Sequence, residues 1–357
     1  MTSVSIVGCG GMASYYLNVY RDLPWISVAS CIDVDLQSAN HAAHQLSAPI
    51  ATSSFEAALS PSVDAVIINT PNHLHRAQAI AAIETGKHVL LQKPVAANIE
   101  DAEAIAKAAE KSDKTIGLYM SYFDQPLMHD LRDLIAQGFL GDPVHFYGRY
   151  MHKGGMITSQ QALEGHHTWR MSLDQTGGGC FIQLAVHYIH LFEWMAGSRA
   201  VRATAVSRNL HSPGIEGEDL ACALLQLSSG AAMTIDTAWC ANGEQLSLHG
   251  TLGRVEYRNS RLLSISSAKG AFSGRIINYT GGLESSFDGI HGVEQQMEIA
   301  PPAFDDSNNP LNQHRMFLEA VRDQKPAFCS VASGVRDLRC VRAVYDSAQS
   351  GRAIDIE

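Results

Sequence analysis

The 357-residue sequence lacks several features that mark specialised protein classes, and each absence narrows the possible functions. It has no run of about 18 apolar residues, which a membrane-spanning helix needs, and no basic segment with a cleavable apolar stretch after Met1. Its 26 Lys and Arg are outnumbered by 36 Asp and Glu, and the resulting charge of −10 disfavours nucleic acid and anionic membranes. We therefore expect a cytoplasmic protein with neither kind of partner.

The seven cysteines also lack the arrangement of a disulfide framework or a zinc site. Their number is odd, no two of them form a CxxC pair, and most lie in apolar runs. Buried free thiols in a reducing compartment are therefore expected. His152, His166, His167 and His190 do not show the spacing of familiar zinc ligands, so no metal is predicted.

The pattern of the first third of the chain predicts an α/β domain. Short apolar segments alternate there with helical stretches, which is typical of βαβ units and a parallel sheet. Strands are expected at 3–7, 26–33, 65–69, 88–92 and 116–120, and helices at 12–22, 35–46, 75–85 and 99–112. Residues 1–122 are therefore predicted to form a doubly wound domain.

Beyond this domain, a helix at about 126–137 is followed by strands that no helices separate. These strands are expected at 144–152, 201–209, 220–227, 231–239, 245–249, 254–258 and 262–266. Their alternation of apolar and polar residues favours an antiparallel sheet with one wetter face. Further helices are expected at 180–196, 313–323 and 333–350, and an irregular stretch at 268–312. Residues 123–357 are therefore predicted to form an α+β domain.

A glycine-rich turn directly after the first strand predicts a dinucleotide site. In the GxGxxA pattern the first glycine allows a tight turn, the second lets the backbone approach a pyrophosphate, and Ala13 permits close packing of the helix on the strand. The loop residues expected at the cofactor are Gly8, Gly10, Gly11 and Met12. Asp33 ends the second strand about 20 residues later, where a carboxylate accepts ribose hydroxyls and repels a 2′-phosphate. NAD is therefore predicted in preference to NADP.

Polar residues also follow two other parallel strands, at the edge where open α/β sheets bind ligands. They are Thr70, Asn72, His75, Gln92 and Lys93, and all five are predicted to bind the cofactor. Lys93, held by the following proline, can also donate to a substrate oxygen and stabilise alkoxide character.

The helix expected at 180–196 carries three polar residues, two of them histidines. Gln183 and His187 are four residues apart and share one face of this helix, and His190 lies within one turn of His187. From the residues alone, histidines buried in a helix interface remain the alternative. Polar and aromatic groups that can bind or stack on a ligand precede the helix, namely His152, His167, Trp169 and Arg170.

Over nearly its whole length the sequence resembles the glucose–fructose oxidoreductase and inositol dehydrogenase family, written Gfo/Idh/MocA. The motifs that carry the resemblance are GxGxxA, TPNxxH at 70–75, GKHV and Lys-Pro within 86–94, QGFLGDP at 137–143, Trp169-Arg170, the GGG segment leading to His187, LSLHGTLG at 246–253, and residues of the final helices from Phe317 to Arg352. The resemblance implies an N-terminal Rossmann domain and a C-terminal domain with a large open, mainly antiparallel sheet that often mediates oligomers. It also implies redox chemistry of sugars and polyols with a pyridine nucleotide.

The resemblance assigns roles to single residues as well. Lys93 and His187 match the family's lysine and histidine around the reacting carbinol, so His187 is expected to take the hydroxyl proton while Lys93 holds the oxygen. Three positions depart from the family: Gln92 replaces Glu, and Gln183 and His190 replace two Asp. Gln183 can orient a hydroxyl but cannot accept a proton as a carboxylate does, which leaves His187 as the main acid–base group and His190 in reserve.

The sequence therefore predicts NAD-dependent hydride transfer to or from a secondary alcohol of a sugar, glycoside or inositol-like polyol, in a homodimer or homotetramer formed through the C-terminal sheet. Two alternatives remain open. One is a glycoside-cleaving enzyme that reduces and reoxidises NAD in each turnover. The other is a non-catalytic NAD-responsive regulator, which fits the lost acids but not the retention of Lys93 and His187.

Overall fold

The computed structural model describes residues 1–270, 284–288, 292–299 and 306–357, and these fall into two units. The first unit combines Met1–Asp124, Asp174–Gly177 and Ala303–Leu338. The second combines Gln125–Leu173, Gly178–Pro302 and Arg339–Glu357. The chain therefore passes between the units more than once.

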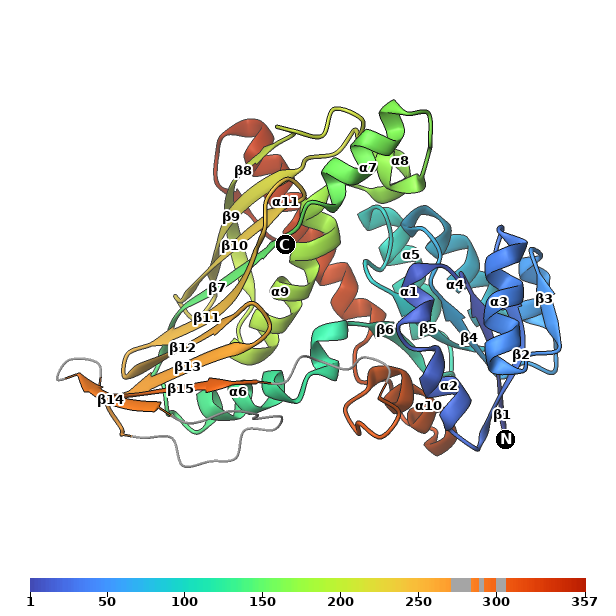
Figure 1. Ribbon diagram of the computed structural model, residues 1–357, viewed down its shortest axis with the longest axis horizontal. Helices are drawn as coiled ribbons and strands as arrows, with labels where there is room; N and C mark the ends of the chain where they lie inside the picture. The colour runs from blue at the N-terminus through green and yellow to red at the C-terminus, as the bar shows by residue number, and fades with distance from the viewer. Residues whose placement is uncertain (271–283, 289–291, 300–305) are drawn as a thin grey trace. The chain divides into compact units, whose positions relative to one another are not determined.

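The first unit contains a six-stranded parallel sheet in the order β3-β2-β1-β4-β5-β6. Its strands are β1 (Thr2–Val7), β2 (Ile26–Ile32), β3 (Ile50–Thr52), β4 (Ala65–Ile68), β5 (His88–Gln92) and β6 (Ile116–Tyr119). The central strand β4 is buried along its whole length, as expected for a parallel sheet covered by helices (Figure 1). This strand order is that of the Rossmann fold, so the predicted doubly wound domain is confirmed.

The helices of this unit follow the predicted pattern, except that one expected helix is broken and that the helix at 313–323, expected within the 123–357 domain, belongs to this unit. They are α1 (Gly11–Ser14), α2 (Leu17–Asp22), α3 (Leu36–Leu46), α4 (His75–Glu84), α5 (Ile99–Glu110) and α10 (Gln313–Asp323), with 3₁₀ turns η1 (Phe55–Leu59), η2 (Asn72–Leu74) and η3 (Ser121–Asp124). The single helix expected at 12–22 is broken between α1 and α2, because Tyr16 leaves helical geometry and points into the core. The short strand β3 was not expected from the sequence.

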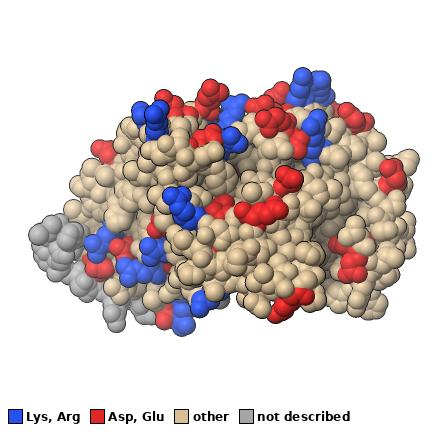
Figure 2. Space-filling model, turned by 90° about the horizontal axis from the view of Figure 1, so that it is seen from above, with Lys and Arg blue, Asp and Glu red and all other residues tan. Residues whose placement is uncertain are grey.

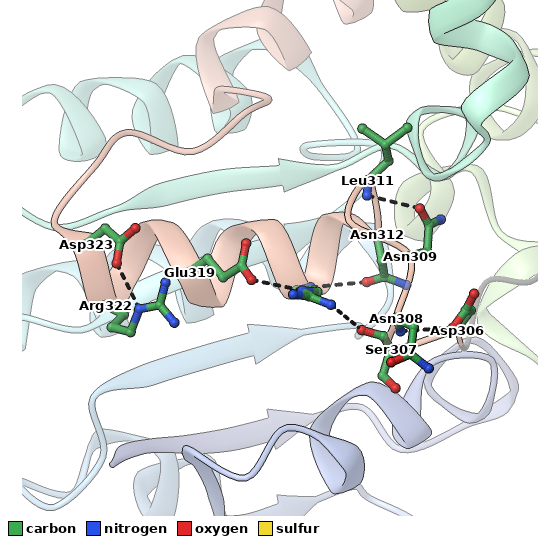
Figure 3. Close-up of polar contacts among 10 residues, drawn as sticks. Asp306, Ser307, Asn308, Asn309, Leu311, Asn312, Glu319, Arg322 and Asp323 are labelled. Carbon is green, nitrogen blue, oxygen red and sulfur yellow. Dashed lines mark hydrogen bonds and ion pairs between the residues drawn. The ribbon is translucent and has the colours of Figure 1, made fainter. Parts of the chain in front are cut away.

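Helix α10 packs against β5 and β6 of the first sheet, although it lies in sequence between β15 and β16 of the second unit's sheet. The side chain of Asn312 accepts from Arg315 N (3.1 Å) and caps the first turn (Figure 3). Arg315 also pairs with Glu319 (2.9 Å) and donates to Ser307 O (2.8 Å). These contacts hold the segment before α10 against its first two turns.

A buried carboxylate fastens α10 to the end of β6. Asp124 is 3% exposed, and its carboxylate accepts from the Tyr119 hydroxyl (2.9 Å) and from Gln313 N (2.8 Å). Its carbonyl accepts from Asn309 Nδ2 (2.7 Å). Burial raises the pKa of Asp124 to about 7, although the bonds from Gln313 and Tyr119 oppose the rise.

This pKa predicts a pH-dependent stability that Asp124→Asn removes. Because the pKa is near 3.9 in an unfolded chain, the folded protein holds the extra proton between about pH 4 and 7, and the contribution of Asp124 to stability falls as pH rises through that window. The quantity to compare is the unfolding free energy of Asp124→Asn minus that of the unmodified protein. We expect this difference to rise by on the order of 2–4 kcal/mol between about pH 4 and pH 8.

Urea unfolding at a series of pH values measures this difference. Asp113→Asn is the matched control, because the Asp113 side chain is 87% exposed and its removal should leave the pH dependence unchanged. Parallel stability curves for Asp124→Asn and the unmodified protein would contradict the raised pKa.

The second unit contains a ten-stranded sheet in the order β14-β15-β13-β12-β11-β7-β10-β9-β8-β16. Its strands are β7 (Pro143–Met151), β8 (Ala200–Arg208), β9 (Leu220–Leu227), β10 (Ala232–Ala238), β11 (Gly243–Gly250), β12 (Gly253–Arg258), β13 (Leu262–Ser267), β14 (Glu284–Asp288), β15 (Gly292–Glu298) and β16 (Ile354–Asp355). All neighbours are antiparallel except β7 and β10. The predicted large, mainly antiparallel sheet is therefore confirmed.

Strands β14 and β15 correct the expectation of an irregular stretch at 268–312. In β15 the polar Gln295 is buried between the more exposed Glu294 and Gln296, so the strand lacks the apolar alternation by which strands are recognised. Within that stretch, residues 271–283, 289–291 and 300–305 lie outside the described part of the chain.

One face of the second sheet is covered by α9 (Cys180–Ala196), which packs on β7, β9 and β10 (Figure 1). Gly148 of β7 allows this approach, since a Cβ there would lie 2.6 Å from the Tyr188 ring of α9. The other helical segments beginning in this unit are α6 (Pro126–Ala136), α7 (Gly154–Leu163), η4 (Trp169–Met171) and α8 (Leu173–Thr176), and α11 (Val331–Ser350) ends in it.

No helix within the described residues is long and apolar enough to cross a membrane. On the face shown in Figure 2, basic and acidic side chains of the described residues are interspersed.

Candidate functional site

The glycine loop after β1 lies against the end of β4. Gly8 has a φ of +84°, and a Cβ there would come within 2.7 Å of the Asn69 carbonyl carbon, so only glycine fits. Gly10 and Gly11 are exposed, and a Cβ at either position would meet no atom within 4 Å. The loop therefore has an open side where a pyrophosphate can approach the backbone, which fits the predicted NAD.

Asp33 follows β2 and is held beside this loop. Its Oδ2 accepts from Cys9 N (2.7 Å) and its Oδ1 from Asp35 N (2.9 Å). Each carboxylate oxygen can accept a further hydrogen bond, so the half-buried group can still receive ribose hydroxyls. The residues that would hold the diphosphate and ribose of NAD are thus adjacent in the structure.

A buried tyrosine that the sequence analysis did not single out joins the loop to β4 and α10. The Tyr16 hydroxyl donates to Asn69 Oδ1, and Asn69 Nδ2 donates to Gly8 O (3.4 Å). The Tyr16 ring stacks on His314 with 3.8 Å between ring centroids. Burial raises the pKa of Tyr16, so its hydroxyl remains a donor. No sequence signal marks this role, because Tyr16 lies within an ordinary helical pattern.

Asn72 and His75 are predicted to bind the cofactor, but the structure directs both buried side chains to backbone carbonyls. Asn72 Nδ2 donates to Thr176 O (2.8 Å). The His75 ring lies 2.9 Å from Thr70 O through Nε2 and 3.0 Å from Pro94 O through Nδ1. Burial lowers the pKa of His75 to about 4, so the neutral ring donates through one nitrogen. These residues shape the ends of β4 and β5.

Gln92 and Lys93 end β5 at the same edge of the sheet. Gln92 is buried, and its Oε1 accepts from Lys93 N (3.0 Å), which fixes the backbone that carries the half-buried lysine. The Lys93–Pro94 peptide bond is cis. Since β1, β4 and β5 are neighbours in the sheet, the structure brings the glycine loop, Thr70 and Lys93 to adjacent strand ends.

In the second unit, α9 carries the residues predicted to contact the reacting sugar or polyol. Gln183 and His187 are each 8% exposed and lie one turn apart on the helix, while His190 is half-buried. The helix starts at Cys180 directly after the three glycines. The arrangement expected from the i, i+4 spacing is therefore present.

The candidate substrate residues lie on segments that share one apolar cluster with α9. Met171, Leu184 and Trp239 belong to this cluster, together with Cys180 and Ile215. Met171 follows the predicted Trp169–Arg170 pair, and Leu184 follows Gln183, so the cluster brings these two segments together.

The side chains of the substrate candidates differ in their contacts. His152 Nδ1 accepts from Gly154 N (3.0 Å), which leaves the proton of the neutral ring on Nε2. The Arg170 guanidinium lies 4.6 Å from the centroid of the Trp169 ring, and His167 is exposed. Within the described residues, no group of three His, Cys, Asp or Glu side chains is placed to hold a metal ion.

Comparison with known proteins identifies two segments of the chain. Residues 2–120 match the oxidoreductase family with an NAD-binding Rossmann fold (GFO_IDH_MocA), and residues 128–256 match the GFO/IDH/MocA C-terminal domain.

Curated relatives include a 1,5-anhydro-D-fructose reductase from Ensifer adhaerens, 32% identical over 56% of this chain and 58% of that protein. A levoglucosan dehydrogenase from Pseudarthrobacter phenanthrenivorans is 24% identical over 72% of this chain and 74% of that protein. An inositol 2-dehydrogenase from Saccharopolyspora erythraea is 30% identical over 54% of each chain. The alignments thus span little more than half of the first and third of these relatives.

Solved structures match over the whole chain. A levoglucosan dehydrogenase in complex with NADH has a TM-score of 0.83 at 20% identity and covers 100% of this chain and 99% of that chain. An oxidoreductase domain protein from Kribbella flavida has a TM-score of 0.81 at 22% identity, with 100% of both chains covered. At these identities the likeness establishes the fold.

Proposed function

We propose that this chain, which belongs to the Gfo/Idh/MocA oxidoreductase family, transfers a hydride between NAD and a secondary alcohol of a sugar, glycoside or inositol-like polyol. The observation that carries the proposal is the edge of the first sheet, where the open glycine loop, the oriented Asp33 carboxylate and Lys93 lie at neighbouring strand ends. The relatives named for levoglucosan, anhydrofructose and inositol support a carbohydrate or polyol as substrate.

The roles of the residues follow from their chemistry. The nicotinamide, when bound, supplies the hydride chemistry. His187 removes the hydroxyl proton as a general base, and Lys93 donates to the same oxygen while negative charge develops on it. Gln183 orients a neighbouring hydroxyl, since its amide both donates and accepts but does not titrate. The remaining hydroxyl-binding or stacking residues in this proposal are His152, His167, Trp169, Arg170 and His190.

A panel of sugars, anhydrosugars and polyols, assayed for NADH formation, tests the proposal. Oxidation of at least one compound, strongly slowed by His187→Ala, is expected. Cleavage of a glycoside without net NADH would instead indicate the redox-assisted enzyme. Binding of NAD with neither oxidation nor cleavage would favour the regulator.

NAD preference is a separate prediction that rests on Asp33. We expect NADH to bind at least about tenfold more tightly than NADPH, because the carboxylate repels the 2′-phosphate. The double variant Asp33→Ser, Val34→Arg should reverse the order, since Val34 is 90% exposed and an arginine there can reach a phosphate. Fluorescence titration with both nucleotides measures the ratio, with Val34→Arg alone as control. Tighter binding of NADPH by the unmodified protein would contradict the assignment.

For the assembly we infer a homodimer or homotetramer formed through the face of the second sheet opposite α9. The exposed Val206 of β8 and Leu224 of β9 lie on this face, beside a contact of Asp236 with Arg149 (3.3 Å) and the Tyr147 hydroxyl (2.7 Å). Such a mixed apolar and polar surface suits an interface between subunits. Light scattering should give two or four times the chain mass of 38.6 kDa, and a mass of one chain would exclude the assembly.

A further inference from the structure

Helix α9, which carries Gln183 and His187, has no capping side chain of its own. Its N-cap residue is Gly179, which makes no side-chain hydrogen bond. The first N–H groups of any α-helix lack partners within the helix and need acceptors from elsewhere. In α9 the groups at this end belong to Gly179, Cys180, Phe181 and Ile182.

Glu218, in the connection between β8 and β9, accepts from three of these groups. Its carboxylate accepts from Gly179 N through Oε2 (2.8 Å) and from Phe181 N through Oε1 (2.8 Å). Its main-chain oxygen accepts from Cys180 N (2.9 Å). One residue far along the sequence thus provides most of the cap of this helix.

Tyr345 of α11 completes the cap. Its hydroxyl oxygen accepts from Ile182 N (3.2 Å), and the same hydroxyl donates to Glu218 Oε1 (3.0 Å). Glu218 and Tyr345 together therefore satisfy all four N–H groups at the start of α9. The carboxylate also lies at the helix end that favours negative charge.

The glycines before α9 leave room for the two capping residues, which a side chain at either position would displace. A Cβ at Gly178 would lie 2.1 Å from the Tyr345 hydroxyl oxygen, and a Cβ at Gly179 would lie 2.0 Å from Glu218 O. A serine, threonine or aspartate, which usually caps a helix, cannot occupy position 179 while Glu218 is in place. The glycine triplet and the distant cap therefore depend on each other.

We propose that Glu218, supported by Tyr345, is a positioning residue that sets the rotation and axial place of the acid–base face of α9. Gln183 immediately follows the capped turn, and His187 lies one turn further along. The catalytic rate depends steeply on such placement, because a displacement of about 1 Å at a reacting group can lower the rate on the order of 10²-fold. The proposal rests on the proposed function of Gln183 and His187.

The test compares Glu218→Gln with Asp219→Asn. Asp219 is an adjacent, fully buried carboxylate that accepts from Leu210 N (2.7 Å) and His211 N (2.8 Å) rather than from α9. Both variants lose a buried carboxylate and are expected to have a lower Tm. At a temperature where both are folded by circular dichroism, Glu218→Gln should lower kcat about 10- to 100-fold with the KM for NAD unchanged, while Asp219→Asn keeps kcat within about twofold.

Tyr345→Phe is the second variant, and it keeps the test informative if Glu218→Gln does not fold. It removes one hydroxyl and leaves the carboxylate, so kcat should fall several-fold. Equal kcat values for the cap variants and Asp219→Asn would overturn the proposal, even if His187→Ala proves inactive and the proposed function stands.

Hydrogen exchange gives a readout that does not depend on activity. The cap variants should speed amide exchange in residues 180–187, and Asp219→Asn should not. Unchanged exchange in this segment would also overturn the proposal. Absence of sugar oxidation, or full activity of His187→Ala, would instead overturn the proposed function and leave the exchange result to decide the role of the cap.

Discussion

Replacement of His187 by alanine should lower kcat for sugar oxidation by about 10²- to 10⁴-fold and should leave NAD affinity unchanged. The expectation follows from the position of His187 on α9, where it is 8% exposed and where Gln183, one turn away, cannot take its place as a base. Steady-state kinetics on a substrate found in the panel, together with titration of NAD, separates the two effects.

His190→Ala is the matched control for this prediction, because His190 lies on the same helix and is half-buried. It should retain kcat within about tenfold of the unmodified protein, since its proposed role is in hydroxyl binding. The opposite result, with His187→Ala active and His190→Ala inactive, would transfer the acid–base role to His190.

Lys93→Met and Lys93→Ala should each lower kcat by about 10²- to 10³-fold, because both remove the charged donor that we propose for the developing alkoxide. Methionine keeps most of the length of the side chain and therefore tests charge apart from packing. Affinity for NAD should be nearly unchanged, since the bond from the main-chain N of residue 93 to Gln92 Oε1 (3.0 Å) remains in both variants.

Half-buried Lys114, paired with Asp113 (3.4 Å), provides the control for loss of a lysine, and Lys114→Ala should have normal kinetics. If NAD affinity and turnover fall together in the Lys93 variants, the lysine holds the strand end and does not act on the substrate.

Local patterns were sufficient to predict most of the first sheet. Strands β1, β2, β4, β5 and β6 are apolar segments bounded by turns, and burial on both faces makes them easy to recognise. The pattern failed where burial is incomplete or the inward residue is polar, as in the partly exposed three-residue β3 and in β15 with its buried Gln295. It also missed the break between α1 and α2, because the inward turn of Tyr16 depends on the distant His314.

Some parts of the candidate site could likewise be predicted from the sequence, and others could not. The sequence by itself determined the glycine turn, Asp33 and the shared face of Gln183 and His187, because each depends on spacing within a single element or between consecutive ones. Lys93 could be placed at a strand end for the same reason.

Only the tertiary structure decided which distant residues hold these groups. In the folded chain the Tyr16 hydroxyl donates to Asn69, and the His75 ring contacts the Pro94 carbonyl. Glu218 and Tyr345 cap helix α9. Helix α10 packs on β5 and β6, far from its neighbours in sequence. Such contacts satisfy buried polar groups across long stretches of chain, and neither hydrophobic periodicity nor local spacing carries information about which partner satisfies which group.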